Sequence, residues 1–210
     1  MGILEEMSEF LQKGKANDVK ALVQKAIDEK MDAKNILEQG LMAGMNIIGE
    51  KFKNNQVYVP EVLIAARAMN AGIGILKPLL VQAGVQAKGT VVLGTVKGDL
   101  HDIGKNLVKM MMEGKGLEVV DLGADVPAEK FIAEAKEKNA KVIACSALLT
   151  TTMTEMKNVV EKAREAGIRD KLTIMVGGAP VTDAYCQSIG ADIYSPDAAS
   201  AAEKALAVFG

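Results

Sequence analysis

The feature that most constrains the fold is an alternation of short apolar runs and amphipathic segments across residues 90–210. Runs that are apolar along their whole length and rich in β-branched residues are typical of parallel strands covered by helices on both faces. This half is therefore predicted to be an α/β domain, a flavodoxin-like or Rossmann-like doubly wound sheet of five parallel strands. The predicted strands are 90–96, 117–123, 141–148, 172–179 and 191–195, with helices near 104–115, 127–138, 152–166, 181–188 and 198–208.

The first part of the chain differs, because its apolar residues recur at helical spacing in successive segments. Asn17 or Asp18 is expected to cap one helix and Asp32 another, and Pro60 is well placed in the first turn of the last helix. Short connections between such helices favour an antiparallel four-helix bundle. The predicted organisation is a helical domain over 1–82, a linker over 83–89 and the α/β domain over 90–210.

Charge and composition exclude several classes of partner. The chain has 25 basic and 27 acidic residues and no block of like charge, which argues against binding to a nucleic-acid backbone. No apolar run is expected to reach the ~20 residues that a membrane-spanning helix needs. The two cysteines, Cys145 and Cys186, fall in segments predicted to be buried, which fits a reducing compartment. A soluble, cytoplasmic protein without nucleic-acid or membrane partners is predicted.

His101 is the only histidine of the chain, and it stands between Asp99 and Asp102 just after the first predicted strand. Open parallel sheets bind ligands at the carboxyl ends of their strands. A neutral imidazole can bind a metal through one ring nitrogen while the other donates to a carboxylate, and Asp99 is placed to accept that bond. One histidine does not complete a zinc site, so a single ligand indicates a metal carried inside a macrocycle. The alternative is a solvated loop histidine beside two incidental aspartates.

Hydroxyl and glycine residues follow two other predicted strands. Ser146 and Thr150–Thr152 come after the third strand, and Gly177-Gly178 ends the fourth. In a 2-1-3-4-5 strand order the first and third strands are neighbours, so His101 and this hydroxyl cluster are expected to face one crevice. Together these residues favour a ligand cavity. The alternatives are helix capping by one hydroxyl and a tight turn at the glycines.

The pattern Asp99-x-His101-x-x-Gly104, followed by Ser146-x-Leu148 and Gly177-Gly178, resembles the cobalamin-binding signature of methionine synthase and its relatives. Residues 44–69 resemble the helical cap module that precedes such domains, and the resemblance covers essentially the whole chain. The chain most resembles the small corrinoid proteins of methylamine, methanol and methoxy-compound methyltransferase systems.

The resemblance implies a cobalamin or other corrinoid cofactor, with His101 as the lower cobalt ligand and Asp99 tuning it by hydrogen bonding. It also implies a slot for the displaced nucleotide tail and a helical half that covers the methyl-bearing face. Tyr58 would be an aromatic cap residue, or alternatively a bundle-core tyrosine, and Ala43 stands where methionine synthase has a glutamate. The residues assigned to the cofactor in this way are Gly98, Asp99, Leu100, His101, Asp102, Ile103, Gly104, Ser146, Leu148, Thr150, Gly177, Gly178, Ala198 and Tyr58.

The function implied by the resemblance is that of a methyl carrier. Cob(I)alamin would take a methyl group from a substrate-specific methyltransferase, and methylcob(III)alamin would deliver it to an acceptor methyltransferase. A reductive activation protein would be a further partner, and the carrier would not be catalytic alone. The alternatives are the small subunit of an adenosylcobalamin-dependent mutase, a cobalamin-based gene regulator and a phosphoacceptor receiver module.

Overall fold

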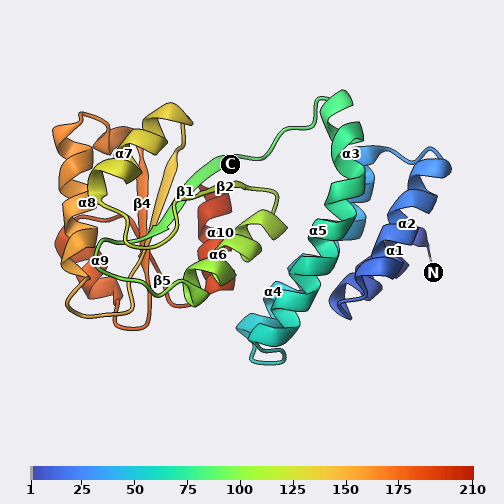
Figure 1. The fold of residues 1–210 in the computed structure, drawn as a ribbon, viewed down its shortest axis with the longest axis horizontal. Helices are drawn as coiled ribbons and strands as arrows, with labels where there is room; N and C mark the ends of the chain where they lie inside the picture. Colours follow the sequence, from blue (N-terminus) through green and yellow to red (C-terminus); the bar gives the residue numbers. More distant parts are fainter. Residues whose placement is uncertain (1) are drawn as a thin grey trace. The chain divides into compact units, whose positions relative to one another are not determined.

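The structure, a computed structural model, describes residues 2–210 and divides into two compact units. The first unit runs to Ala87 and includes the short segment Gly114–Gly116, and the second comprises Lys88–Glu113 and Leu117–Gly210. In Figure 1 the helices of the first unit are blue to teal, and the sheet of the second unit runs from green to red.

Four helical stretches make up the first unit, as predicted. They are α1 (Ile3–Gln12), α2 (Ala16–Asp28), a continuous stretch of α3 (Ala33–Asn35), η1 (Ile36–Met42) and α4 (Ala43–Lys53), and α5 (Val59–Gln82).

The ends of these helices test the capping predictions. Asp32 caps α3, because its carboxylate accepts a hydrogen bond from Asn35 N at 2.9 Å. Pro60 lies in the first turn of α5, as predicted. The cap predicted for α2 was wrong, since α2 begins one residue before Asn17 and its N-cap is Lys15. The π-helical turn η1 has no counterpart in the predicted pattern.

Helix α5 corrects one expectation from composition. It has 24 residues and a mean hydropathy of 1.4 in its most apolar window, enough by length and composition alone to cross a bilayer. The absence of any apolar run of that length was therefore wrongly predicted. In the structure α5 packs against α1, α2 and α4, and its buried residues include Val62, Met69 and Leu76. The core helix of a bundle passes the same test as a spanning helix.

The second unit is the predicted doubly wound sheet. Its strands are β1 (Thr90–Thr95), β2 (Glu118–Asp121), β3 (Val142–Ser146), β4 (Thr173–Gly177) and β5 (Ile193–Ser195). All of the pairings are parallel and the order is β2-β1-β3-β4-β5, so β1 and β3 are neighbours at the point where the order reverses. The register aligns the last residues of four strands in one row: Thr95, Ser146, Gly177 and Ser195.

Helices cover both faces of this sheet. They are α6 (Ile103–Gly114), α7 (Ala128–Glu137), α8 (Thr154–Glu165), α9 (Asp183–Ile189) and α10 (Ala198–Ala207). In Figure 1, α7, α8 and α9 lie on one face, and α6 and α10 on the other. Under α7 the fully buried Phe131 ring lies directly over Gly94, where any added Cβ would approach the ring within 2.8 Å.

Cys145 and Cys186 are buried and free, as predicted. Burial raises the pKa of the Cys145 thiol to about 12, so this cysteine is a neutral part of the core.

Candidate functional site

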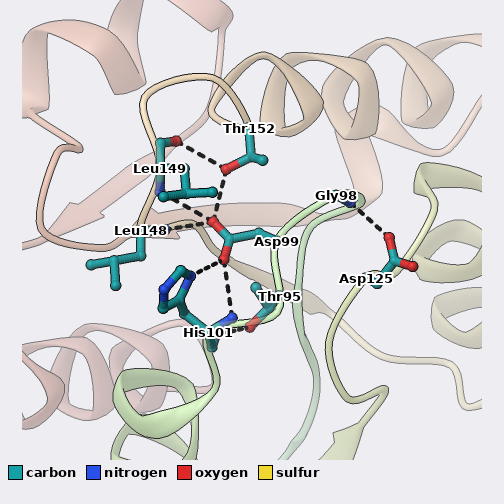
Figure 2. A network of polar contacts seen from close by, with 8 residues as sticks. All are labelled: Thr95, Gly98, Asp99, His101, Asp125, Leu148, Leu149 and Thr152. Carbon is teal, nitrogen blue, oxygen red and sulfur yellow. Dashed lines mark hydrogen bonds and ion pairs between the residues drawn. The ribbon is translucent and has the colours of Figure 1, made fainter.

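The polar run after β1 begins with a tight turn. Asp99 N donates to the carbonyl oxygen of Val96 at 3.1 Å, which closes a four-residue turn around Lys97 and Gly98. Gly98 has φ +79, the conformation that the third residue of a type II turn requires and that side chains disfavour. The turn brings Asp99 next to the segment that follows β3, as Figure 2 shows.

Asp99 is fully buried and accepts hydrogen bonds on both carboxylate oxygens. Oδ2 accepts from Leu148 N at 2.8 Å, Leu149 N at 3.2 Å and Thr152 Oγ1 at 2.8 Å. Oδ1 accepts from the backbone N of His101 at 3.1 Å and from its ring Nδ1 at 2.7 Å. Burial acts to raise the pKa of Asp99, but these donors outweigh it and hold the pKa well below its usual range. The carboxylate is therefore ionised.

The state of the His101 ring follows from that charge. An ionised carboxylate only accepts hydrogen bonds, so the proton of this bond belongs to Nδ1. In the neutral ring Nε2 then carries the lone pair. The His101 side chain is 51% exposed. A metal-binding histidine held by a carboxylate at its second nitrogen has this arrangement.

The structure disfavours the alternative of a solvated histidine beside incidental aspartates. Asp99 is buried and is bonded by donors from two loops, so its place beside the ring is specific. Asp102 differs, because it precedes α6 and its Oδ2 accepts from Asn106 Nδ2 at 3.1 Å. Within residues 2–210 no cluster of three or more His, Cys, Asp or Glu side chains could hold a free metal ion. One protein ligand, His101, is what this edge of the sheet offers.

Large apolar side chains are exposed around His101. Leu100 and Ile103 are each 76% exposed, and Leu148 and Leu149 are 44% and 41% exposed. Exposed apolar side chains gathered at one place mark a binding surface. An apolar surround with one free imidazole nitrogen fits a large ring that carries its own metal. Gly104, in the first turn of α6, adds to the open space, because a Cβ there would meet no atom within 4 Å.

The glycines at the end of β4 are required by the chain itself. Gly178 has φ +133, and a Cβ on it would collide with the carbonyl oxygen of Ala147. A Cβ on Gly177 would approach the carbonyl oxygen of Ser195 to 3.3 Å. The tight turn considered as the alternative is present, since Val181 N donates to the Gly178 carbonyl at 2.9 Å. Close approach of a ligand to Gly177-Gly178 stays a prediction.

The remaining predicted residues lie at the same edge or in the other unit. Ser146 is the partly buried last residue of β3. Thr150 is exposed in the loop after β3, and Ala198 is the buried first residue of α10. Tyr58 caps α5 in the helical unit and is 64% exposed, so a bundle-core tyrosine was the wrong alternative.

Three contributors at this edge escaped the sequence analysis: Thr95, Asp125 and Ser195. Thr152 belongs to the hydroxyl cluster predicted after the third strand, but its bond to Asp99 was not predicted. Thr95 Oγ1 donates to the His101 carbonyl at 2.9 Å, and Asp125 Oδ1 accepts from Gly98 N at 2.7 Å. The Ser195 hydroxyl is buried and has no hydrogen-bond partner within the described chain. Such an orphan polar group fits a ligand with polar substituents at this edge.

Comparisons with known proteins match both units of the chain. Residues 89–206 match a family described as the B12 binding domain, and residues 3–77 match a second family with the same description. The dimethylamine corrinoid protein of Methanosarcina barkeri is 45% identical over 97% of this chain and 95% of its own length. A corrinoid protein of Desulfitobacterium hafniense is 39% identical over 100% of this chain and 99% of its own length.

Solved structures extend the comparison to the fold. A methanol:cobalamin methyltransferase complex from Methanosarcina barkeri matches with a TM-score of 0.88 and 32% identity, over 99% of this chain and 79% of that chain. A cobalamin-binding protein from Desulfitobacterium hafniense DCB-2 matches with a TM-score of 0.79 and 30% identity, over 96% of both chains. The chain therefore belongs to the B12-binding family of corrinoid proteins and binds a corrinoid cofactor.

Proposed function

We propose that this protein is the methyl carrier of a transfer system with two enzymes. It receives a methyl group from a substrate-specific methyltransferase and delivers it to an acceptor methyltransferase. Full-length relatives named dimethylamine and trimethylamine corrinoid proteins support this function, and so does the similarity to a methanol:cobalamin methyltransferase complex. The same relatives disfavour a mutase subunit.

The relatives also support a donor class. Several relatives that are 43–45% identical are named for dimethylamine or trimethylamine, whereas the methanol complex is 32% identical. We therefore infer that the methyl donor is a methylated amine. A reductive activation protein would restore the carrier after oxidation of its cobalt.

The observation that carries the proposal is the 2.7 Å hydrogen bond between Asp99 Oδ1 and His101 Nδ1. When bound, the corrinoid supplies a cobalt ion that takes a methyl group in its reduced state and gives it up from the oxidised, methylated state. His101 Nε2 is the proposed protein ligand of that cobalt. Three side chains exposed around the His101 imidazole are proposed to pack against the corrinoid: Leu100, Ile103 and Leu148.

Asp99 performs two tasks in this arrangement. It keeps the proton on Nδ1 and so leaves the Nε2 lone pair available, and it holds the imidazole ring in one orientation.

Electron paramagnetic resonance tests the proposed ligation. The full-length protein is loaded with cob(II)inamide, a corrinoid without its own benzimidazole base. We expect three-line splitting from one axial nitrogen, because His101 is the only histidine of the chain. The His101→Ala protein should bind this corrinoid without the splitting. A wild-type spectrum without axial nitrogen would contradict the ligation.

A second measurement tests the carrier function. The loaded protein is reduced with titanium(III) citrate and treated with labelled methyl iodide, and the protein-bound label is then counted. We expect light-sensitive, stoichiometric labelling of the loaded protein and none of the apoprotein. Labelling that is equal in the apoprotein would indicate side-chain alkylation and contradict methyl carriage.

A further inference from the structure

His101 is bonded at its backbone as well as at its ring. Its N–H donates to Asp99 Oδ1 at 3.1 Å, and its carbonyl accepts from Thr95 Oγ1 at 2.9 Å. Thr95 is the last residue of β1 and is fully buried, so its hydroxyl is fixed by the sheet. The carbonyl of His101 is thereby tied to the rigid strand rather than to the loop that carries the ring.

Asp125 holds the other side of the same loop. It lies in the connection between β2 and α7, where its Oδ1 accepts from Gly98 N at 2.7 Å and its own N donates to the Asp99 carbonyl at 2.9 Å. Asp125 has φ +54, a conformation that aspartate and asparagine tolerate better than most residues. Figure 2 shows Thr95 beside His101 at one end of the Gly98–His101 segment and Asp125 beside Gly98 at the other end.

These two side chains supply what the Asp99–His101 bond alone does not. Asp99 and His101 are two residues apart in one loop, so the bond between them fixes the ring relative to Asp99, whose other bonds lead to the loop after β3. Thr95 relates the loop to β1, and Asp125 relates it to the connection after β2. A ligand held within a narrow range of positions before its metal arrives costs less to order on binding.

We propose that Thr95 and Asp125 are positioning residues for His101, the proposed cobalt ligand. They fix the backbone on both sides of Asp99, so that His101 Nε2 is presented before the corrinoid binds. The effect on the bound cofactor rests on the ligation proposed above, whereas the effect on the ring is a property of the apoprotein.

Matched variants separate the polar bonds from general packing. Thr95→Val removes the hydroxyl at nearly constant shape, and Thr95→Ser keeps it. Asp125→Gly removes the carboxylate while tolerating positive φ, and Asp125→Asn keeps an acceptor oxygen and also tolerates it.

The first readout uses the apoprotein. Ring nitrogen-15 NMR of a single histidine needs no assignment, and the wild type should show one tautomer with its proton on Nδ1. The Val and Gly variants should show an averaged or mixed ring signal, and the Ser and Asn variants should keep the wild-type signal.

The second readout uses the full-length protein with cob(II)inamide. The Val and Gly variants should bind it about tenfold more weakly, with broadened or reduced nitrogen splitting. The Ser and Asn variants should bind with wild-type affinity and splitting. Thermal unfolding of each apoprotein serves as the folding control.

Wild-type ring signals and wild-type cobinamide affinity in both the Val and Gly variants would overturn the proposal. Equal losses of cobinamide affinity in Thr95→Val and Thr95→Ser, and in Asp125→Gly and Asp125→Asn, would also overturn it. The polar atom that the Ser and Asn variants retain would then have no role. A wild-type protein without nitrogen splitting would instead contradict the ligation by His101, and the apoprotein NMR still decides the positioning role.

Discussion

At the scale of single residues, the site depends on a buried charge that the protein satisfies completely. Asp99 is shielded from water, and its two oxygens accept from two backbone amides of the loop after β3, from Thr152, and from His101 at both its backbone and its ring. A buried carboxylate without such partners would become protonated and lose its hold on the imidazole tautomer. The loop after β3 thus controls the chemistry of the loop after β1.

Replacement of His101 by alanine should leave the apoprotein folded. The ring is half exposed, and Asp99 Oδ1 keeps the backbone N–H of residue 101 as a donor. We therefore expect the free energy of unfolding to change by less than about 1 kcal/mol. Chemical denaturation of the two apoproteins measures this change. A collapse of stability would show that the imidazole has a mainly structural role.

Replacement of Thr152 by valine should weaken the same network from the other loop. The variant removes the 2.8 Å bond to Asp99 Oδ2 but keeps a similar shape, so we expect a loss of about 1–2 kcal/mol of apoprotein stability. Thr152→Ser, which keeps the hydroxyl, should lose less than half of that. Urea denaturation of both variants gives the comparison. Equal losses would assign the effect to the methyl group.

At the scale of secondary structure, the strands could be predicted because their apolar runs are continuous and each ends in glycine or polar residues. The parallel order follows from the alternation with helices, and all five strands lie within the predicted ranges. The features that were missed depend on contacts between distant parts of the chain. Thr152 and Asp99 are 53 residues apart, so the local sequence gives no sign of their bond. The π-helical turn η1 similarly includes Gly40, which packs against Met7 of α1.

An ion pair joins α6 to β2 and allows a test of stability against pH. Lys105, only 2% exposed, donates from Nζ to Asp121 Oδ1 at 2.6 Å. Burial acts to raise the pKa of Asp121, but the hydrogen bond from Lys105 and that from Gly123 N outweigh it and lower this pKa. Since the folded pKa lies below the unfolded value of about 3.9, the stabilisation is present above that pH and is lost as the pH falls through the folded pKa.

We therefore expect Asp121→Asn to cost about 2 kcal/mol at pH 7, because it leaves the buried ammonium without its carboxylate. The difference from the wild type should shrink below about pH 4. Lys109→Gln is a matched control, since Lys109 is 33% exposed at 3.4 Å from Asp121 and should cost below about 1 kcal/mol. A difference that is constant between pH 7 and pH 3 would contradict the assigned titration.

At the scale of the whole molecule, the chain consists of two compact units, with α5 ending at Gln82 and β1 beginning at Thr90. The segment between them contains Gly84 and Gly89. A methyl carrier must expose the same cobalt face to a donor enzyme and to an acceptor enzyme. We propose that the helical unit covers this face and moves aside for each of them, which is a form of conformational gating.

A fragment of residues 88–210 tests whether the second unit alone binds the corrinoid and whether the helical unit covers it. It contains the whole sheet, its helices and the Asp99–His101–Thr152 network, so it should fold and bind cobinamide with the nitrogen splitting of the full chain. Methylcobalamin bound to the fragment should photolyse faster than in the full-length protein, because a covering unit would hold the methyl radical near cobalt for recombination. Equal photolysis rates in a folded, loaded fragment would contradict the covering role of the helical unit, while the ligation by His101 would still stand on the splitting.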